Sequence, residues 1–192
     1  MCLALLKRPG AYLPDEYLRT AWQNNPDGAG YMFADSGLLH VRRGFGKLKK
    51  FLKAWKADMR NHPRANFIMH FRLATHGSKA LANCHPMPIN ADLAFVHNGI
   101  FNIHIPTDGD SDTKALADHI AQWPKGWLFD DASWQVLTKF CGRNNKLIFL
   151  TANDEVRIVN ELSGQWSHGV WYSNHSYLFA GYYGAGRLQI GP

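Results

Sequence analysis

The chain has 192 residues, of which 46% are hydrophobic and 19% charged, and its net charge is +6. This length predicts one domain, and the apolar content excludes a largely disordered chain. No apolar run approaches the roughly 20 residues of a membrane span, which excludes an integral membrane protein. The first residues place their positive charge after the apolar stretch, the reverse of a secretory signal, so we expect a cytoplasmic protein.

The first part of the chain alternates short apolar runs with amphipathic segments. In chain order these predict a strand at 3–6, a helix at 14–22, strands at 29–34 and 38–42 around a hairpin turn at 35–37, a helix at 46–60 and a strand at 65–71.

The second part begins with an irregular loop rich in glycine, asparagine and proline. It predicts, in order, a loop at 77–92, a strand at 93–96, helices at 114–123 and 131–141, and strands at 146–151, 156–160, 170–173 and 177–180. Many strands with a few helices in mixed order indicate sheets covered by helices.

Basic residues concentrate between positions 42 and 64, where nine basic residues stand against one acidic residue. Within this segment Leu48, Phe51, Leu52 and Trp55 recur at helical spacing. One interpretation is a helix over 46–60 that contacts nucleic acid or a membrane surface. We favour the other, a helix packed on the core with a solvated lysine face, because lysine faces are ordinary helix surface. We therefore expect neither a nucleic-acid nor a membrane partner.

Three cysteines, Cys2, Cys84 and Cys141, are too few and too scattered for a disulfide framework, and no CxxC occurs. The histidines that follow Cys84 match no common zinc spacing, so no metal site is predicted. Cys2 suggests different chemistry. Removal of Met1 would leave a thiol and an α-amine on one residue, and an amine with a pKa of about 7.7–8.0 can act as the base for its own side chain.

Three further motifs each have a structural and a functional interpretation. Arg72 follows an apolar strand, where it can form a salt bridge or bind a carboxylate through two parallel hydrogen bonds. The pair Asn98-Gly99 can form a type I′ hairpin turn, or an oxyanion hole from a side-chain amide and a backbone N–H. The stretch Ser111-Asp112-Thr113 suits a helix N-cap, and Asp112 can also hold an ammonium group.

Taken together, these motifs resemble the glutaminase domain of class II glutamine amidotransferases, which belong to the N-terminal nucleophile (Ntn) hydrolases. One branch of that family carries His-x-Arg-Trp-Ala-Thr-His-Gly, and this chain has His70-Phe71-Arg72-Leu73-Ala74-Thr75-His76-Gly77. The turn at 27–30 and the loop at 83–86 are also similar to the family. The order of the motifs is the family's order, and the resemblance covers roughly residues 2–120.

The resemblance implies an α+β fold, a four-layer αββα sandwich of two mainly antiparallel sheets, in a single stand-alone domain over residues 2–192. It implies hydrolysis of the side-chain amide of L-glutamine, with ammonia released to a partner protein that accepts it. The implied catalytic residues are Cys2 as the nucleophile, and the Asn98 side chain and Gly99 N–H as the oxyanion hole. No metal or organic cofactor is needed.

For substrate binding, the resemblance implies that Arg72 holds the α-carboxylate of glutamine and that Asp112 holds its α-ammonium. Thr75 and His76 are expected to line the same pocket.

The chain departs from the family pattern in ways that keep other functions open. Leu3 stands where the family has a glycine, Leu73 replaces an aromatic residue, and the interval from Gly99 to Asp112 is short. No synthase domain follows within the sequence. One alternative is a catalytically silent binding module that uses the basic helix at 46–60. Another is an Ntn amidohydrolase that acts on a different amide.

Overall fold

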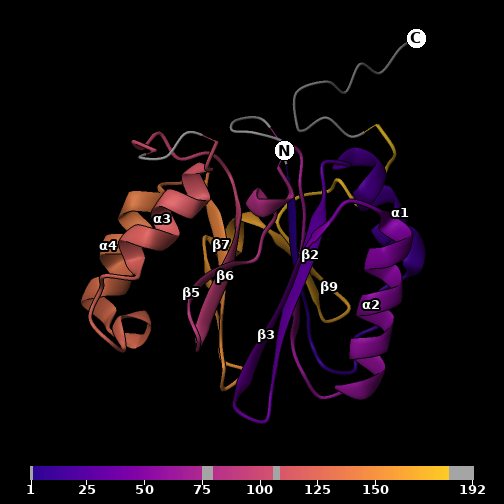
Figure 1. Cartoon of the computed structure of the whole chain (residues 1–192), viewed down its shortest axis with the longest axis horizontal. Helices are drawn as coiled ribbons and strands as arrows, with labels where there is room; N and C mark the ends of the chain where they lie inside the picture. The colour runs from indigo at the N-terminus through magenta and orange to yellow at the C-terminus, as the bar shows by residue number, and fades with distance from the viewer. Residues whose placement is uncertain (1, 75–79, 106–108, 182–192) are drawn as a thin grey trace.

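The computed structural model describes residues 2–74, 80–105 and 109–181. Two antiparallel sheets pack face to face, and a pair of helices covers the outer face of each, as Figure 1 shows. The described helices are α1 (Asp15–Asn24), α2 (Leu48–Asn61), α3 (Asp112–Ile120) and α4 (Asp131–Cys141). The predicted α+β fold with four αββα layers is confirmed.

The first sheet has six strands, and every pair of neighbours in it is antiparallel. Its order is β3 (Leu38–Phe45), β2 (Ala29–Asp35), β4 (Phe67–Phe71), β1 (Leu3–Lys7), β10 (Val170–Tyr172) and β9 (Gln165–Ser167).

The second sheet has four antiparallel strands, in the order β5 (Met87–Asn90), β6 (Leu93–Asn98), β7 (Lys146–Thr151) and β8 (Val156–Val159). Short 3₁₀ helices lie at η1 (Leu81–Asn83), η2 (Trp127–Phe129) and η3 (Glu161–Ser163).

Strand alternation divides the core into three apolar clusters. Leu3, Leu5 and Met69 pack toward α1 and α2, and Phe95 packs toward α3 and α4. The residues between them along the strands form the middle cluster, in which Ala4, Leu6, Ile68, Ala94 and Val96 join the two sheets. Successive strand residues point to opposite faces. Continued along each strand in steps of two residues, this alternation brings Cys2, Arg72 and Asn98 to one end of the inter-sheet layer.

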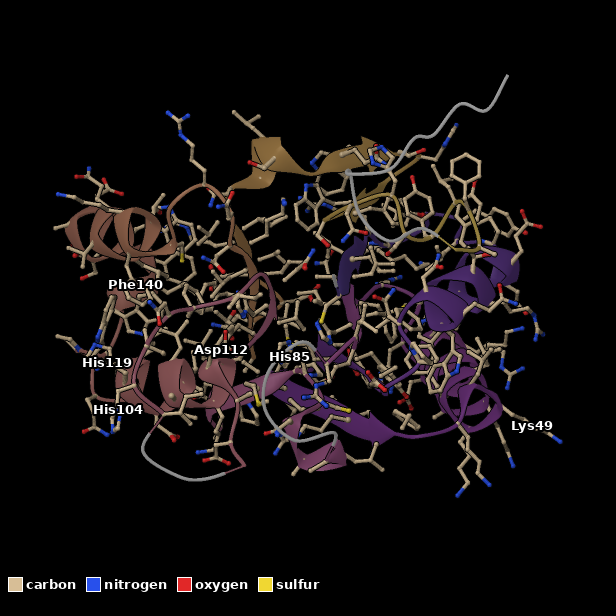
Figure 2. The ribbon with its side chains drawn as sticks, turned by 90° about the horizontal axis from the view of Figure 1, so that it is seen from above. Lys49, His85, His104, Asp112, His119 and Phe140 are labelled. Atoms are coloured by element: carbon tan, nitrogen blue, oxygen red, sulfur yellow. The ribbon has the colours of Figure 1, made fainter. Side chains whose placement is uncertain are left out.

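Helix α2 packs on the core and exposes a lysine face, which is the interpretation that we favoured for the basic segment. Phe51, Leu52 and Trp55 are buried against the six-stranded sheet, whereas Lys49 and Lys53 are exposed. Lys49 points outward at the edge of the molecule in Figure 2. Strand β3 ends at Phe45, and the helix begins at Leu48, two residues later than predicted.

Two predictions about strands are wrong. The loop expected over 77–92 contains β5, and the strand expected at 177–180 is a series of turns. The Asn24 side chain explains these turns, because its Nδ2 donates to the carbonyls of Ser176 and Phe179 at 2.7 Å each. Its Oδ1 accepts from the N–H of Gly181 at 2.8 Å, so the segment folds around one carboxamide.

Strand β9 was not expected at all. None of the helices in the described part of the chain is both long and apolar enough to cross a membrane.

Candidate active site

A cavity lies where β4 and β6 end and where β1 and α3 begin, at one end of the inter-sheet layer. Its lining residues are Cys2, His70, Arg72, Leu73, Ala74, Asn83, His85, His97, Gly99, Ile100, Ser111, Asp112 and Thr113. Figure 2 views the molecule from above, with His85 and Asp112 near the middle between the two halves. The cavity therefore brings together four of the predicted site residues, Cys2, Arg72, Gly99 and Asp112.

Of the other three predicted site residues, the structure describes one. Asn98 is buried beside the cavity but does not line it. Thr75 and His76 lie outside the described residues.

Cys2 directs its sulfur at the backbone that follows Arg72. Its Sγ lies 3.3 Å from the N–H of Leu73 and 3.4 Å from the Leu73 carbonyl oxygen. The carbonyl of Cys2 accepts a hydrogen bond from Asn174 Nδ2 at 2.7 Å, which fixes the chain just before β1. Burial raises the pKa of the Cys2 thiol, and the hydrogen bond from the Leu73 N–H and the Arg72 charge offset this only in part. The thiol is therefore protonated at neutral pH and needs a base before it can act as a nucleophile.

Arg72 is 4% exposed, at the end of β4. Its N–H donates to the carbonyl of Gly28 at 2.8 Å, and its carbonyl accepts from the N–H of Asp27 at 3.0 Å. The Asp27 carboxylate also accepts from the N–H of Ala74 at 2.9 Å. The turn that begins at Asp27 thus holds the arginine segment on both sides of Arg72.

The glycines of that turn allow a second loop to approach. A Cβ at Gly28 would lie 2.4 Å from Cys84 Sγ, and one at Gly30 would lie 2.2 Å from the carbonyl oxygen of His85. A side chain at either position would push the loop that carries His85 away from the cavity. The two glycines of the Asp27-Gly28-Ala29-Gly30 turn are therefore explained by the close approach of this loop.

Asn98 and Gly99 do not form the hairpin turn that was one interpretation of the pair. Asn98 ends β6, and its neighbour across the sheet is Lys146, far along the chain. Gly99 has a φ of 155°, and a Cβ there would lie 2.1 Å from Asn145 Oδ1. Asn98 Nδ2 lies 2.7 Å from Ser173 Oγ. The motif ends a central strand at the cavity.

The N-cap interpretation of the Ser111-Asp112-Thr113 stretch is confirmed, and the ammonium-binding role of Asp112 stays a prediction. Ser111 caps α3, because its Oγ accepts from the N–H of Lys114 at 3.1 Å. Asp112 lines the cavity, and its two carboxylate oxygens accept from the N–H groups of Phe101 and Thr113 at 2.7 Å each. Two backbone donors hold the carboxylate still. Oδ1 also lies 3.2 Å from the Thr113 hydroxyl, whereas Oδ2 keeps a lone pair for a ligand.

The hydrogen-bond partners of His97 determine which of its ring nitrogens carries the proton. Asn145 Nδ2 donates to the Cys141 carbonyl at 2.9 Å, so Asn145 Oδ1 is the atom that faces His97 Nε2, also at 2.9 Å. Burial lowers the pKa of His97, which is therefore neutral and carries its proton on Nε2. Its Nδ1 then accepts from the Thr113 hydroxyl at 2.8 Å. This chain of bonds ties β6 to the start of α3.

Two more buried histidines stand in the cavity wall. The rings of His70 and His85 have centroids 4.0 Å apart, and His85 Nδ1 accepts from the N–H of His97 at 3.2 Å. Burial lowers the pKa of His70 to about 3 and that of His85 well below its ordinary value. Neither ring nitrogen of His70 has a hydrogen-bond partner within the described ranges. The alternation of Ile68, His70 and Arg72 was a signal that His70 shares the arginine's face.

The described residues contain no group of three or more histidine, cysteine or acidic side chains placed to hold a metal ion. The structure also places Leu3 and Leu73, two of the departures from the family pattern. Leu3 points toward α1 and α2, in the outer apolar cluster, and does not line the cavity. Leu73 lines the cavity, and its backbone contacts the Cys2 sulfur.

No protein-family model matches the chain. The chain is 35% identical over 103 residues to a Shewanella oneidensis protein named glutamine–fructose-6-phosphate aminotransferase (isomerizing), a match that covers 53% of the chain and 16% of that relative. Proteins of the same name from Aquifex aeolicus and Zymomonas mobilis are 30% identical over 117 residues and 42% identical over 74 residues.

These two matches cover 54% and 38% of the chain, and 19% and 12% of the respective relatives. The chain thus spans less than a fifth of the length of each of these curated relatives. Its similarity is to one part of these glutamine-using aminotransferases.

Proposed function

We propose that the chain is a glutamine amidotransferase domain of class II, which hydrolyses the side-chain amide of L-glutamine to glutamate and ammonia. The observation that carries the proposal is that Cys2, Arg72, Gly99 and Asp112, which lie far apart in the sequence, line one cavity. The relatives support the substrate, because their names include glutamine.

Cys2 acts as the nucleophile after Met1 is removed. Because burial raises the pKa of its thiol, the reaction needs a nearby base, and the new α-amine on the same residue takes the proton. The sulfur attacks the amide carbon to give a tetrahedral oxyanion. When this collapses to a thioester, the C–N bond breaks and the α-amine returns the proton to the leaving ammonia. Water then cleaves the thioester, releasing glutamate and restoring the thiol.

Two charged side chains hold the amino-acid end of glutamine. Arg72 binds the α-carboxylate, because a guanidinium offers two parallel donors to a carboxylate. Asp112 binds the α-ammonium with a carboxylate that two backbone N–H groups already fix in place. We also propose that Thr75 and His76, which lie outside the described residues, contact the substrate.

The oxyanion is stabilised by the Asn98 side chain and the N–H of Gly99. Loss of one such donor lowers kcat by about 10²–10³-fold in other enzymes, so these two groups carry much of the rate enhancement. The released ammonia is used in an acceptor reaction, which we propose takes place on a partner protein. The acceptor named in the relatives, fructose-6-phosphate, is the first to try.

The test is the intact mass of the purified protein before and after incubation with a glutamine-like diazoketone. We expect a mass without Met1, a single adduct on Cys2, and ammonia release from glutamine that the reagent abolishes. Cys2→Ser should take up no reagent, whereas Cys141→Ser, a buried cysteine in α4, should react like the parent.

Other outcomes identify the alternatives. No adduct and no ammonia would leave a catalytically silent binding module. Release of ammonia from another amide, but not from glutamine, would indicate an amidohydrolase of different specificity. Full activity with Met1 or an N-terminal tag in place would contradict the proposed base.

A further inference from the structure

Ser173 joins the two sheets at the catalytic end of the molecule. It follows β10 directly and is 2% exposed. Its Oγ lies 2.9 Å from the N–H of Ala4 in β1 and 2.7 Å from Nδ2 of Asn98 in β6. The middle cluster around it is apolar, so this hydroxyl is a polar bridge in a layer where unmet hydrogen bonds are costly.

Counting protons shows that the bridge has a preferred direction. The N–H of Ala4 can only donate, so Ser173 Oγ accepts from it and keeps one proton to donate. With Nδ2 of Asn98 toward Ser173, the hydroxyl accepts twice and its own proton is unused. Asn98 Oδ1 is then buried with no hydrogen-bond partner in the described part of the chain. In this arrangement the Ser173 hydroxyl proton and Asn98 Oδ1 are both left without a hydrogen bond.

The carboxamide has a second orientation of the same shape. A half-turn about its Cβ–Cγ bond exchanges the oxygen and the nitrogen. The Ser173 O–H then donates to Asn98 Oδ1 while Oγ still accepts from Ala4. The one group that is left without a hydrogen-bond partner is then the donor Nδ2 of Asn98. A buried donor that no protein acceptor uses is what a developing oxyanion requires.

We infer that Ser173 is a positioning residue, which holds the Asn98 carboxamide with Oδ1 toward itself and so reserves Nδ2 for the oxyanion. The inference rests on the proposed function, because only an oxyanion formed at Cys2 gives Nδ2 its use. Ser173 itself is not among the residues that line the cavity. It acts through Asn98, and its link to Ala4 ties that side chain to the strand that carries the nucleophile.

The kinetic test compares Ser173→Ala with Ser176→Ala. Ser176 is a matched control, because it is 1% exposed and its Oγ accepts from Asn25 rather than Asn98. We expect Ser173→Ala to lower kcat for glutamine by about 10-fold or more while KM changes by less than about 2-fold. Ser176→Ala should leave both constants unchanged, and Ser173→Thr, which keeps the hydroxyl, should restore kcat.

A double variant separates positioning from general damage. In an Asn98→Ala background, Ser173→Ala should cause no further loss of kcat, because the side chain that it positions is absent. Multiplicative losses in the double variant, or an equal loss of kcat in Ser176→Ala, would overturn the inference.

A measurement on the unaltered protein tests the orientation without any activity. Neutron diffraction from a perdeuterated crystal shows which carboxamide atom of Asn98 carries two deuterons. We expect them on the atom that faces away from Ser173, and a deuterated nitrogen facing Ser173 would overturn the inference. If that orientation is found in a protein that releases no ammonia from glutamine, the proposed function fails while the positioning by Ser173 stands.

Discussion

At Gly99 the backbone has a φ of 155°, a conformation that L side chains rarely adopt. A Cβ there would also lie 2.1 Å from Asn145 Oδ1 and 2.8 Å from His97 Nε2, and these two atoms form a hydrogen bond with each other. The N–H that we assign to the oxyanion hole therefore belongs to a residue that is restricted twice, by its backbone and by its neighbours.

Gly99→Ala should destabilise the protein by more than the backbone strain alone, because the new methyl must displace Asn145 from His97. Gly37→Ala is the control, since Gly37 also has a positive φ, 75°, but no atom within 4 Å of a Cβ. Urea unfolding should show a loss of about 1–2 kcal/mol for Gly37→Ala and about 3 kcal/mol or more for Gly99→Ala. Equal losses would mean that the Asn145 contact yields without cost.

The assigned roles of Arg72 and Asn98 separate substrate binding from chemistry. Arg72→Lys keeps the charge but loses the planar pair of donors, so it should raise KM for glutamine far more than it lowers kcat. Asn98→Ala should do the opposite and lower kcat by about 10²-fold, because its donor matters most in the transition state. Steady-state ammonia release measures both constants. Similar behaviour of the two variants would show that the roles are wrongly assigned.

Among the elements, those with a clear apolar pattern were predictable from the sequence. Strands β1, β4 and β6 are apolar runs, and α2 has a complete apolar stripe, so their buried faces follow from periodicity. The turns after β10 were not predictable, because the Asn24 side chain, some 150 residues away, holds them. Strand β9 is three residues long and has no pattern of its own.

The exposed lysines of α2 give a prediction at the scale of one element. Phe51 and Trp55 are committed to the core, so no aromatic side chain remains on the lysine face to stack on bases. We expect weak oligonucleotide binding without sequence preference, which is lost at physiological salt. A titration with single- and double-stranded oligonucleotides at two salt concentrations measures this.

The matched variant changes Lys49, Lys50 and Lys53 to glutamine and leaves Lys56, which pairs with Asp15, in place. It should bind still more weakly and keep its stability. Tight binding that survives physiological salt in the parent and vanishes in this variant would favour the binding-module alternative.

At the scale of the whole molecule, the cavity depends on the packing of the two sheets. Cys2 and Arg72 adjoin strands β1 and β4 of the six-stranded sheet. Gly99 follows β6 of the four-stranded sheet, and Asp112 begins α3. Motif order indicated these residues because each motif is local. The sequence did not reveal Ser173 or the contact between His70 and His85, because neither pairing has a local pattern and both exist only after the sheets pack.

The three buried histidines of this packed end make stability depend on pH. Burial lowers the pKa of His70, His85 and His97 in the folded protein, to about 3 for His70, while the unfolded value is about 6.5. Below pH 6.5 the unfolded chain therefore binds more protons than the folded one, so stability falls as the pH falls. More than about one unit above pH 6.5, where these histidines are neutral in the unfolded chain as well, they contribute no pH dependence.

Each histidine that stays neutral in the folded state adds a slope of about 1.4 kcal/mol per pH unit below its unfolded pKa. Urea unfolding of the parent between pH 6 and pH 5, above the ordinary carboxylate range, should show this loss. His70→Phe keeps a ring against His85 but cannot take up a proton, so its slope should be smaller than that of the parent by about 1.4 kcal/mol per pH unit. The exposed His104, changed to glutamine, is the control and should keep the parent's slope. Equal slopes of stability against pH for the parent and His70→Phe would show that His70 is protonated in the folded protein. The conclusion that His70 is a neutral histidine of the cavity would then be wrong.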